Sequence, residues 1–320
     1  MKKTISLLMV FIFILTFAAC SKKRVEEGGN SDTASSQSQT VTSQSTEKND
    51  EKYQQGGDAM SSENQTVTSS STVTINEDSA RVLVEGKGEA WTLSNTYKKL
   101  TQDKKLSIAY LGGSVTWGTG STTGNSWREI ITKWFKEKYP NATINEINAA
   151  IGGTGSLYGF QRLRKDVLKR EPDLVFIEFA MNDVYENMTK TKAAANIDAI
   201  IRKINAYNPE IDIILVFITS EGNVNEDYPV KQGHRHVAEY YGVPYIDIGN
   251  ALAAEISKTG KPWSYYSGDV VHPNDKGYKI YADEVRKNLE KWLNEAKAQT
   301  PKKHNINQTA AVTYPYDISK

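Results

Sequence analysis

The sequence has little of two features that would point to particular classes of protein. Among 320 residues there is one cysteine, so a framework of internal disulfide bonds is excluded. Neither sign of charge is in excess, since 39 lysines and arginines face 38 aspartates and glutamates. A dedicated nucleic-acid-binding surface usually shows a basic excess, so we expect no nucleic-acid partner. The length allows one good-sized domain with additional segments, because domains run about 100–200 residues.

The single cysteine, Cys20, lies at the end of a short apolar segment. Two lysines near the start precede an apolar run over 5–17, and two alanines come directly before the cysteine. A charged start, an apolar centre and small residues at the cleavage site are typical of a secretory signal peptide. The run is short for a transmembrane helix, which needs about 20 residues. An ordinary signal peptide or an uncleaved anchor helix are the alternative interpretations.

Residues 1–20 resemble a bacterial lipoprotein signal, in which Cys20 is lipidated after cleavage. Phe17 departs from the leucine that such signals usually carry at the third place before the cysteine. The resemblance implies an extracytoplasmic protein tethered to a bacterial membrane through its lipid anchor. Burial of acyl chains supplies the force, about 0.8 kcal/mol per CH₂ group.

Residues 21–74 are polar, and SSQSQTVTSQST nearly recurs as SSENQTVTSSST. Such a composition buries too little apolar surface to offset the entropy of ordering, which predicts a disordered Ser/Thr/Gln-rich linker. The composition is equally compatible with a spacer that extends the domain away from the membrane and with a tail that has no such role. Alternating apolar and polar residues then indicate possible strands in an N-terminal arm over 75–105, followed within the arm by a short helix at 94–100.

Strands and helices alternate over 106–298, which we take as the main domain. The expected strands are 107–111, 143–148, 174–179, 212–218 and 244–248, and the expected helices are 126–139, 157–170, 190–207, 231–241 and 274–298. This alternation predicts an α/β fold, with a parallel sheet and helices on both faces. Residues 299–320 form a polar tail, in which 310–316 could add an edge strand.

Polar or glycine-rich segments follow the expected strands. The first strand stops at two glycines and leads to Ser114, the second leads to Gly153 in NAAIGGTG, and the third to Asn182 in AMND. Asp269 and His272 follow later, in SGDVVHP. Because the carboxyl ends of parallel strands meet at one edge of the sheet, we expect these segments to converge.

Such a convergence could perform acyl transfer. A serine hydroxyl is a poor nucleophile until a base accepts its proton, and His272 is the candidate base for Ser114. Asp269 could hold the imidazole in the right tautomer and stabilise its cation. Candidate donors to an oxyanion are the backbone N–H groups of Ser114 and Gly153 and the side-chain amide of Asn182. Taken singly, a serine or asparagine in a turn is more often a cap or turn former.

Together these segments resemble the SGNH hydrolases, also called GDSL lipases and esterases. The matching residues, found over 106–293, are Ser114, Gly153, Asn182 and His272, with Asp269 in an Asp-x-x-His pair. The resemblance implies a three-layer flavodoxin-like SGNH fold, with a five-stranded parallel sheet in the order 2-1-3-4-5. It also implies ester hydrolysis without a metal or other cofactor.

Two positions depart from the family's pattern. Gly113 stands where the first segment usually has aspartate, and Ala180 stands where the third usually has glycine. Neither position transfers a proton, so we expect the chemistry to be retained. The segments GGSVTWG, NAAIGGTGS and EFAMND are similar to those of bacterial members that act on carbohydrate esters.

Other motifs carry weaker hypotheses. The glycine-rich loop at 118–124 misses the G-x-G-x-x-G spacing by one residue, and no GK[ST] is present, so nucleotide binding is not expected. His234 and His236 are two residues apart, whereas helical neighbours are three or four apart. We therefore expect solvent-facing side chains there and no metal site. His304, in the basic tail, predicts no function.

Aromatic residues near the predicted site are candidates for contacting a sugar, because CH faces of sugars pack on aromatic rings. These are Trp117, Trp263, Tyr265 and Tyr266. Packing beneath the loops is the alternative, and it is the favoured one for Trp117. Asp183, beside Asn182, is expected to be structural.

The sequence thus predicts an extracellular, lipid-anchored serine esterase that removes short acyl groups, acetyl in particular, from a polysaccharide. Its expected partners are an acylated polysaccharide or other ester and, through the anchor, a membrane. The alternatives are a lipase or arylesterase of the same family, a glycan O-acetyltransferase, and a non-catalytic glycan-binding lipoprotein.

Overall fold

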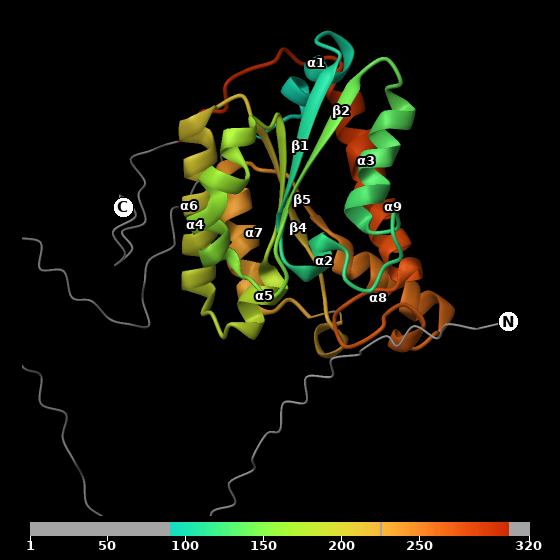
Figure 1. Ribbon diagram of the computed structural model, residues 1–320. Coiled ribbons are helices and arrows are strands. Elements are labelled where there is room, and N and C mark those ends of the chain that lie inside the picture. The colour runs from blue at the N-terminus through green and yellow to red at the C-terminus, as the bar shows by residue number, and fades with distance from the viewer. Residues whose placement is uncertain (1–89, 225, 307–320) are drawn as a thin grey trace, which may run out of the picture. The chain divides into compact units, whose positions relative to one another are not determined.

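The structure is a computed structural model that describes residues 90–224 and 226–306 (Figure 1). Four predicted features lie outside these residues: the signal segment with Cys20, the linker 21–74, the strands of the N-terminal arm and the edge strand at 310–316. Within the described ranges, none of the helices combines the length and hydrophobicity that crossing a bilayer requires.

A five-stranded parallel sheet lies at the centre of the described part. Its strands are β1 (Lys105–Gly112), β2 (Thr143–Ala150), β3 (Leu174–Glu178), β4 (Asp212–Phe217) and β5 (Tyr245–Asp247). They are arranged in the order β2-β1-β3-β4-β5, and neighbouring strands run parallel. The predicted α/β fold and strand order are confirmed. The register places Gly112 opposite both Ala150 and Glu178, so β1, β2 and β3 end at one level.

Helices cover both faces of this sheet (Figure 1). On one face lie α4 (Ser156–Asp166), α5 (Ala180–Tyr185), α6 (Lys190–Tyr207) and α7 (Pro229–Tyr241). The other face carries α3 (Trp127–Lys138), α8 (Ile248–Thr259) and α9 (Asp275–Ala296). Two short helices complete the set, α1 (Ser94–Thr101) before the sheet and α2 (Ser114–Trp117) directly after β1.

The helix α8 is not among the helices expected from the sequence. Its start is nevertheless marked in the sequence, because the Asp247 side chain accepts a hydrogen bond from Asn250 N. Its end is marked by Gly260, which has a φ of 65°. The helix begins at Ile248, directly after β5 ends at Asp247, so the apolar pattern of the strand runs into that of the helix. The expected helix 157–170 is likewise divided into α4 and a 3₁₀ turn, Leu168–Arg170.

The core fills both faces of the sheet, and every residue of β3 and β4 is buried. Tyr110 on β1 stacks on Phe176 of β3 with ring centroids 5.1 Å apart, and Trp127 packs edge-on against both rings. The helix carrying Trp127 begins with a capping box, in which Ser126 and Glu129 satisfy each other's backbone N–H groups.

His304 has a structural role that its place in a basic tail did not indicate. Its ring is buried, stacks on Trp91 at a centroid distance of 3.9 Å, and places Nε2 2.7 Å from Asp212 Oδ1. Asp212 also accepts hydrogen bonds from the backbone and hydroxyl of Thr96 on α1. The chain before the sheet and the chain after α9 are therefore joined at the start of β4.

Close packing of α4 on the sheet generates a prediction for stability. A Cβ at Gly159 would overlap the ring of Phe179. Although alanine favours a helix by about 1 kcal/mol over glycine, overpacking a core costs about 1–3 kcal/mol. Gly159→Ala should therefore lower the free energy of unfolding, measured by denaturant titration. A Phe179→Leu background should reduce the loss, and equal losses in both backgrounds would contradict this account.

Candidate active site

Ser114 is the first residue of α2 and follows β1 through two glycines that the turn requires. A Cβ at Gly112 would overlap the Thr116 side chain, and a Cβ at Gly113 would overlap Asn182 Oδ1. The absence of side chains at these two positions lets the chain reverse sharply and presents a half-buried Ser114 at the carboxyl edge of the sheet.

The structure brings Ser114, His272 and Asp269 into one hydrogen-bonded series. His272 Nε2 lies 2.8 Å from Ser114 Oγ, and His272 Nδ1 lies 2.7 Å from Asp269 Oδ2. A nucleophile within reach of a base, with the base oriented by a third group, is the arrangement that acyl transfer needs. The side chain of His272 is 22% exposed and that of Asp269 is 53% exposed, so the series is open on its acidic side.

Local hydrogen bonds keep Asp269 ionised. Partial burial raises the pKa of its carboxyl group, but hydrogen bonds from the His272 ring and from the backbone N–H groups of Val271 and His272 outweigh this effect and lower the pKa. Both backbone donors bind Oδ1 at 2.8 Å, which leaves Oδ2 for the imidazole. The Asp-x-x-His segment therefore forms a turn whose own backbone N–H groups bind the Asp269 carboxylate.

Two of the aromatic residues considered for substrate binding are buried, and one of them supports this turn. Trp263 is 7% exposed, and its Nε1 donates to the carbonyl of Asp269 at 2.6 Å. Tyr266 is buried, with its hydroxyl 2.9 Å from Thr259 Oγ1. For Trp263 the packing alternative applies, because its indole N–H is used by the turn.

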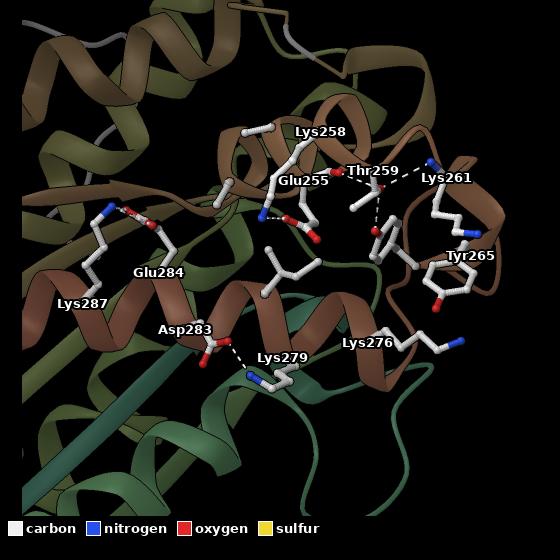
Figure 2. A pocket seen from close by; sticks show the side chains of 14 residues that line it. Glu255, Lys258, Thr259, Lys261, Tyr265, Lys276, Lys279, Asp283, Glu284 and Lys287 are labelled. Carbon is white, nitrogen blue, oxygen red and sulfur yellow. Dashed lines mark hydrogen bonds and ion pairs between the residues drawn. The ribbon is translucent and has the colours of Figure 1, made fainter.

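Tyr265 and Tyr266 face a groove between α8 and α9 (Figure 2). This groove has a volume of about 800 Å³ and its wall includes five lysines and three acidic residues. The Tyr265 ring is 40% exposed and lies under the ammonium group of Lys276, 3.9 Å from the ring centroid.

The residues proposed to bind an oxyanion surround Ser114. Asn182 lies in the first turn of α5, and a Cβ at Gly113 would be 3.2 Å from its Nδ2. On the other side, a Cβ at Gly152 would be 3.6 Å from Ser114 Cβ. Gly153 follows with a φ of 70°, in the left-handed region that favours glycine. Gly113 stands where the family usually has aspartate. In this chain a side chain at Gly113 would overlap Asn182, so the glycine leaves room for the Asn182 amide.

A buried acid, Glu178, lies beneath this turn and was missed by sequence reasoning. It is the last residue of β3, is 1% exposed, and accepts a hydrogen bond from Thr116 Oγ1 at 2.8 Å. Burial raises its pKa to about 7, although hydrogen bonds from Thr116 and from the backbone of Gly113 lower it. The available signal is a lone acidic residue inside the apolar run LVFIEFA.

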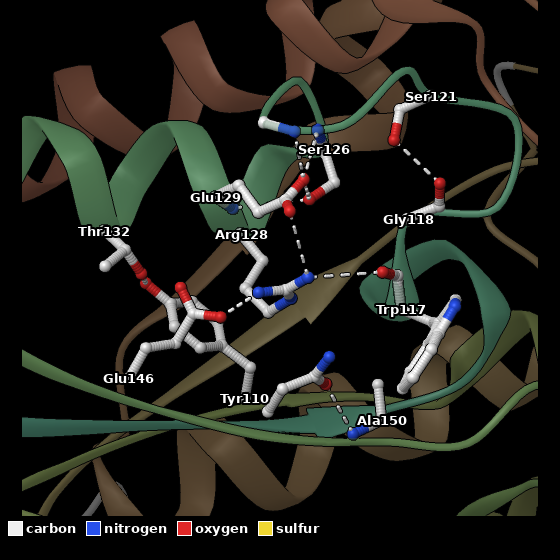
Figure 3. A network of polar contacts seen from close by, with 12 residues as sticks. Tyr110, Trp117, Gly118, Ser121, Ser126, Arg128, Glu129, Thr132, Glu146 and Ala150 are labelled. Atoms are coloured by element: carbon white, nitrogen blue, oxygen red, sulfur yellow. Dashed lines mark hydrogen bonds and ion pairs between the residues drawn. The ribbon is translucent and has the colours of Figure 1, made fainter.

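A buried arginine holds the other end of α2 (Figure 3). Arg128 Nε donates to the carbonyl of Thr116 at 3.2 Å, and Nη2 donates to that of Trp117 at 3.3 Å. Glu146 on β2 pairs with the same guanidinium group. A cation at a helix C-terminus interacts favourably with the carbonyl groups that lack helical partners. The helix that carries Ser114 is therefore fixed by an acid near its start and an arginine at its end.

The expectation that His234 faces solvent is wrong, whereas the structural role expected for Asp183 is observed. His234 is 2% exposed, and its Nε2 lies 2.9 Å from Asp183 Oδ2. Asp183 also accepts hydrogen bonds from the backbone N–H and the hydroxyl of Ser156, each at 2.7 Å. The helical spacing argument failed because the partner of His234 comes from α5, 51 residues away. His236 is half-buried.

Exposed apolar side chains adjoin each part of the site. Trp117, Val270 and Ile151 are 56%, 55% and 39% exposed. The packing role favoured for Trp117 is therefore incorrect, because its backbone is held by Arg128 while its ring extends into solvent (Figure 3). Among the described residues no group of histidine, cysteine, aspartate or glutamate side chains could hold a metal ion.

Comparison with known proteins agrees with a hydrolase of this architecture. The model of the GDSL-like lipase/acylhydrolase family matches residues 110–280. This match covers more than half of the sequence, and the chain belongs to that family, as its resemblance to the SGNH hydrolases predicted. No curated protein matches the chain.

Solved structures share the fold. A two-domain esterase active on acetylated mannans is 26% identical, with a TM-score of 0.58 over 73% of this chain and 59% of that one. The same esterase co-crystallised with mannopentaose is 27% identical, with a TM-score of 0.58 over 69% and 59%. A variant of an acetyl-xylooligosaccharide esterase from Geobacillus stearothermophilus is 20% identical, with a TM-score of 0.50 over 57% and 94%. The chain thus spans 59% of the two-domain esterase's length.

The contact between Gly113 and Asn182 generates a prediction for activity. Gly113→Ala should displace the Asn182 amide and lower kcat for a small ester by up to about 10²–10³-fold, the cost of removing one oxyanion donor. Asn182→Ala should give a comparable loss. Gly222→Ala serves as the control, because a Cβ there meets nothing within 4 Å. An unchanged kcat in Gly113→Ala would contradict the assignment of Asn182.

Proposed function

We propose that this protein is a serine esterase that removes acetyl or other short acyl groups from a polysaccharide. The observation that carries the proposal is the continuous series of hydrogen bonds from Ser114 through His272 to Asp269, at 2.8 and 2.7 Å. Membership of the GDSL-like lipase/acylhydrolase family supports ester hydrolysis as the reaction.

In the proposed mechanism, Ser114 Oγ attacks the ester carbonyl carbon while its proton passes to His272 Nε2. Asp269 stabilises the imidazolium that results. The backbone N–H groups of Ser114 and Gly153 and the Asn182 amide stabilise the oxyanion. His272 then gives the proton to the departing alcohol, which leaves an acyl group on Ser114. Water attacks this acyl group, its proton passes to His272 and then to Ser114 Oγ, and the carboxylic acid is released.

Two observations support a carbohydrate substrate. The two-domain esterase active on acetylated mannans is more than a quarter identical to this chain and shares its fold. The exposed ring of Trp117 lies three residues after Ser114, where it could pack on the CH face of a sugar. The apolar side chains nearest the site, Ile151 and Val270, are exposed. Because they are exposed, we propose a short acyl group as the one that the site accepts.

The proposed location follows from the sequence before residue 90. A lipidated Cys20 would tether the protein to a membrane outside the cytoplasm, and the polar linker would carry the esterase away from it. This location suits a polysaccharide that is too large to be imported. Replacing Cys20 by serine and comparing the labelling of both chains with a radioactive fatty acid would test the anchor.

Acetate release from acetylated xylan, acetylated mannan and p-nitrophenyl acetate tests the reaction. The proposal expects release from a polysaccharide, and a loss of several orders of magnitude in kcat in Ser114→Ala. Retention of most activity in Ser114→Ala would exclude the mechanism. A preference for long-chain aryl esters over acetate esters would indicate a lipase, and acetyl transfer to an added glycan would indicate a transferase.

The role of Asp269 is tested separately. Asp269→Asn keeps the size of the side chain but removes the charge that stabilises the imidazolium, so kcat should fall by about 10³–10⁴-fold. Asp283→Asn is a matched control, because Asp283 is a partly exposed acid on α9, paired with Lys279. Circular dichroism should be the same for both variants. A tenfold loss or less in Asp269→Asn would assign the orienting role elsewhere.

A further inference from the structure

Two buried charged residues link the three segments that carry the proposed oxyanion donors. These segments are the turn after β1 with Ser114, the loop after β2 with Gly153, and the start of α5 with Asn182. Arg162 on α4 contacts the first and second segments, and Asp183 contacts the second and third. Neither side chain takes part in the proton transfers proposed above, although Arg162 is 7% exposed and Asp183 is fully buried.

Arg162 joins the ends of β1 and β2. Its Nη2 donates to the carbonyl of Gly112 at 3.2 Å, and its Nη1 donates to the carbonyl of Ala149. The Gly112 carbonyl also accepts a hydrogen bond from Ile151 N at 3.0 Å. Because Gly112 precedes Ser114 by two residues and Ile151 precedes Gly153 by two, the guanidinium group fixes the two backbone donors relative to each other.

Asp183 joins the loop after β2 to α5. Its carboxylate accepts the backbone N–H and the hydroxyl of Ser156, while the preceding residue, Asn182, supplies the third donor. Glu186, which directly follows the same helix, accepts the backbone N–H of Gly155 at 2.7 Å. Gly155 has no room for a side chain between these two acids. The loop that carries Gly153 is therefore tied to the helix that carries Asn182.

We infer that Arg162 and Asp183 are positioning residues that set the distances among the three oxyanion donors. The inference rests on the proposed function and concerns the same site. The planar fork of an arginine can donate to two carbonyl groups in a fixed geometry, which a lysine cannot reproduce. Misplacing a donor lowers the stability of the transition state more than that of the bound ester, because donors must match the oxyanion's position.

The test compares Arg162→Lys with Arg164→Lys, a matched control on the exposed face of the same helix. In Arg162→Lys, kcat for p-nitrophenyl acetate should fall about 10–100-fold while KM changes less than about threefold. The affinity for methylboronic acid, whose tetrahedral adduct on Ser114 mimics the intermediate, should fall by the same factor. Asp183→Asn should behave alike, and thermal unfolding should show that each variant is folded.

Two results would overturn the inference. The first is a kcat and boronate affinity in folded Arg162→Lys and Asp183→Asn that equal those of the unaltered protein. The second is a loss that appears equally in Arg164→Lys. Ser114→Ala separates this failure from failure of the proposed function. If Ser114→Ala is inactive while both positioning variants are fully active, the esterase mechanism stands and only the positioning role is lost.

Discussion

The candidate site depends on one steric constraint, the absence of side chains at Gly112 and Gly113. Gly112 lies level with the ends of β2 and β3, so the chain must turn within a space already occupied by Thr116 and Asn182. Two glycines allow that turn, and the turn places Ser114 between the segments that follow the neighbouring strands. A side chain at Gly112 would displace Thr116, and one at Gly113 would displace Asn182 from its place beside Ser114.

Buried acidic and basic side chains hydrogen-bond to this turn and to the segments beside it. Glu178 accepts hydrogen bonds from the Gly113 backbone and the Thr116 hydroxyl, and Arg128 donates to the carbonyl of Trp117 at the end of α2. Arg162 and Asp183 bind the flanking segments. Burying such groups is costly unless each is hydrogen-bonded, so the arrangement tolerates few alternative geometries. A site built in this way has its donors oriented before the ester arrives, which is how an oxyanion is stabilised without reorganisation.

The sequence predicted the strands, because short apolar runs bounded by glycines and polar residues are typical of strands buried on both faces. It predicted the convergence of Ser114, Asn182 and His272 because parallel strands end at one edge. It did not predict the burial of His234 and His304, whose acidic partners lie 51 and 92 residues away. Nor did it show that Trp117 is exposed. Arg128 binds the backbone carbonyl of Trp117 and leaves its ring in solvent. Pairings across elements leave no local periodic signal.

The two sides of the site differ in a way that suits the two halves of the proposed reaction. The segments that carry the proposed oxyanion donors are joined by the buried side chains of Arg162 and Asp183, whereas His272 and Asp269 lie on a turn that solvent reaches. That turn relies on Trp263, which binds the carbonyl of Asp269, and on its own backbone N–H groups, which together with the His272 ring lower the pKa of the Asp269 carboxyl group. Water needed to release the acyl group can therefore approach His272 from the open side without disturbing the donors.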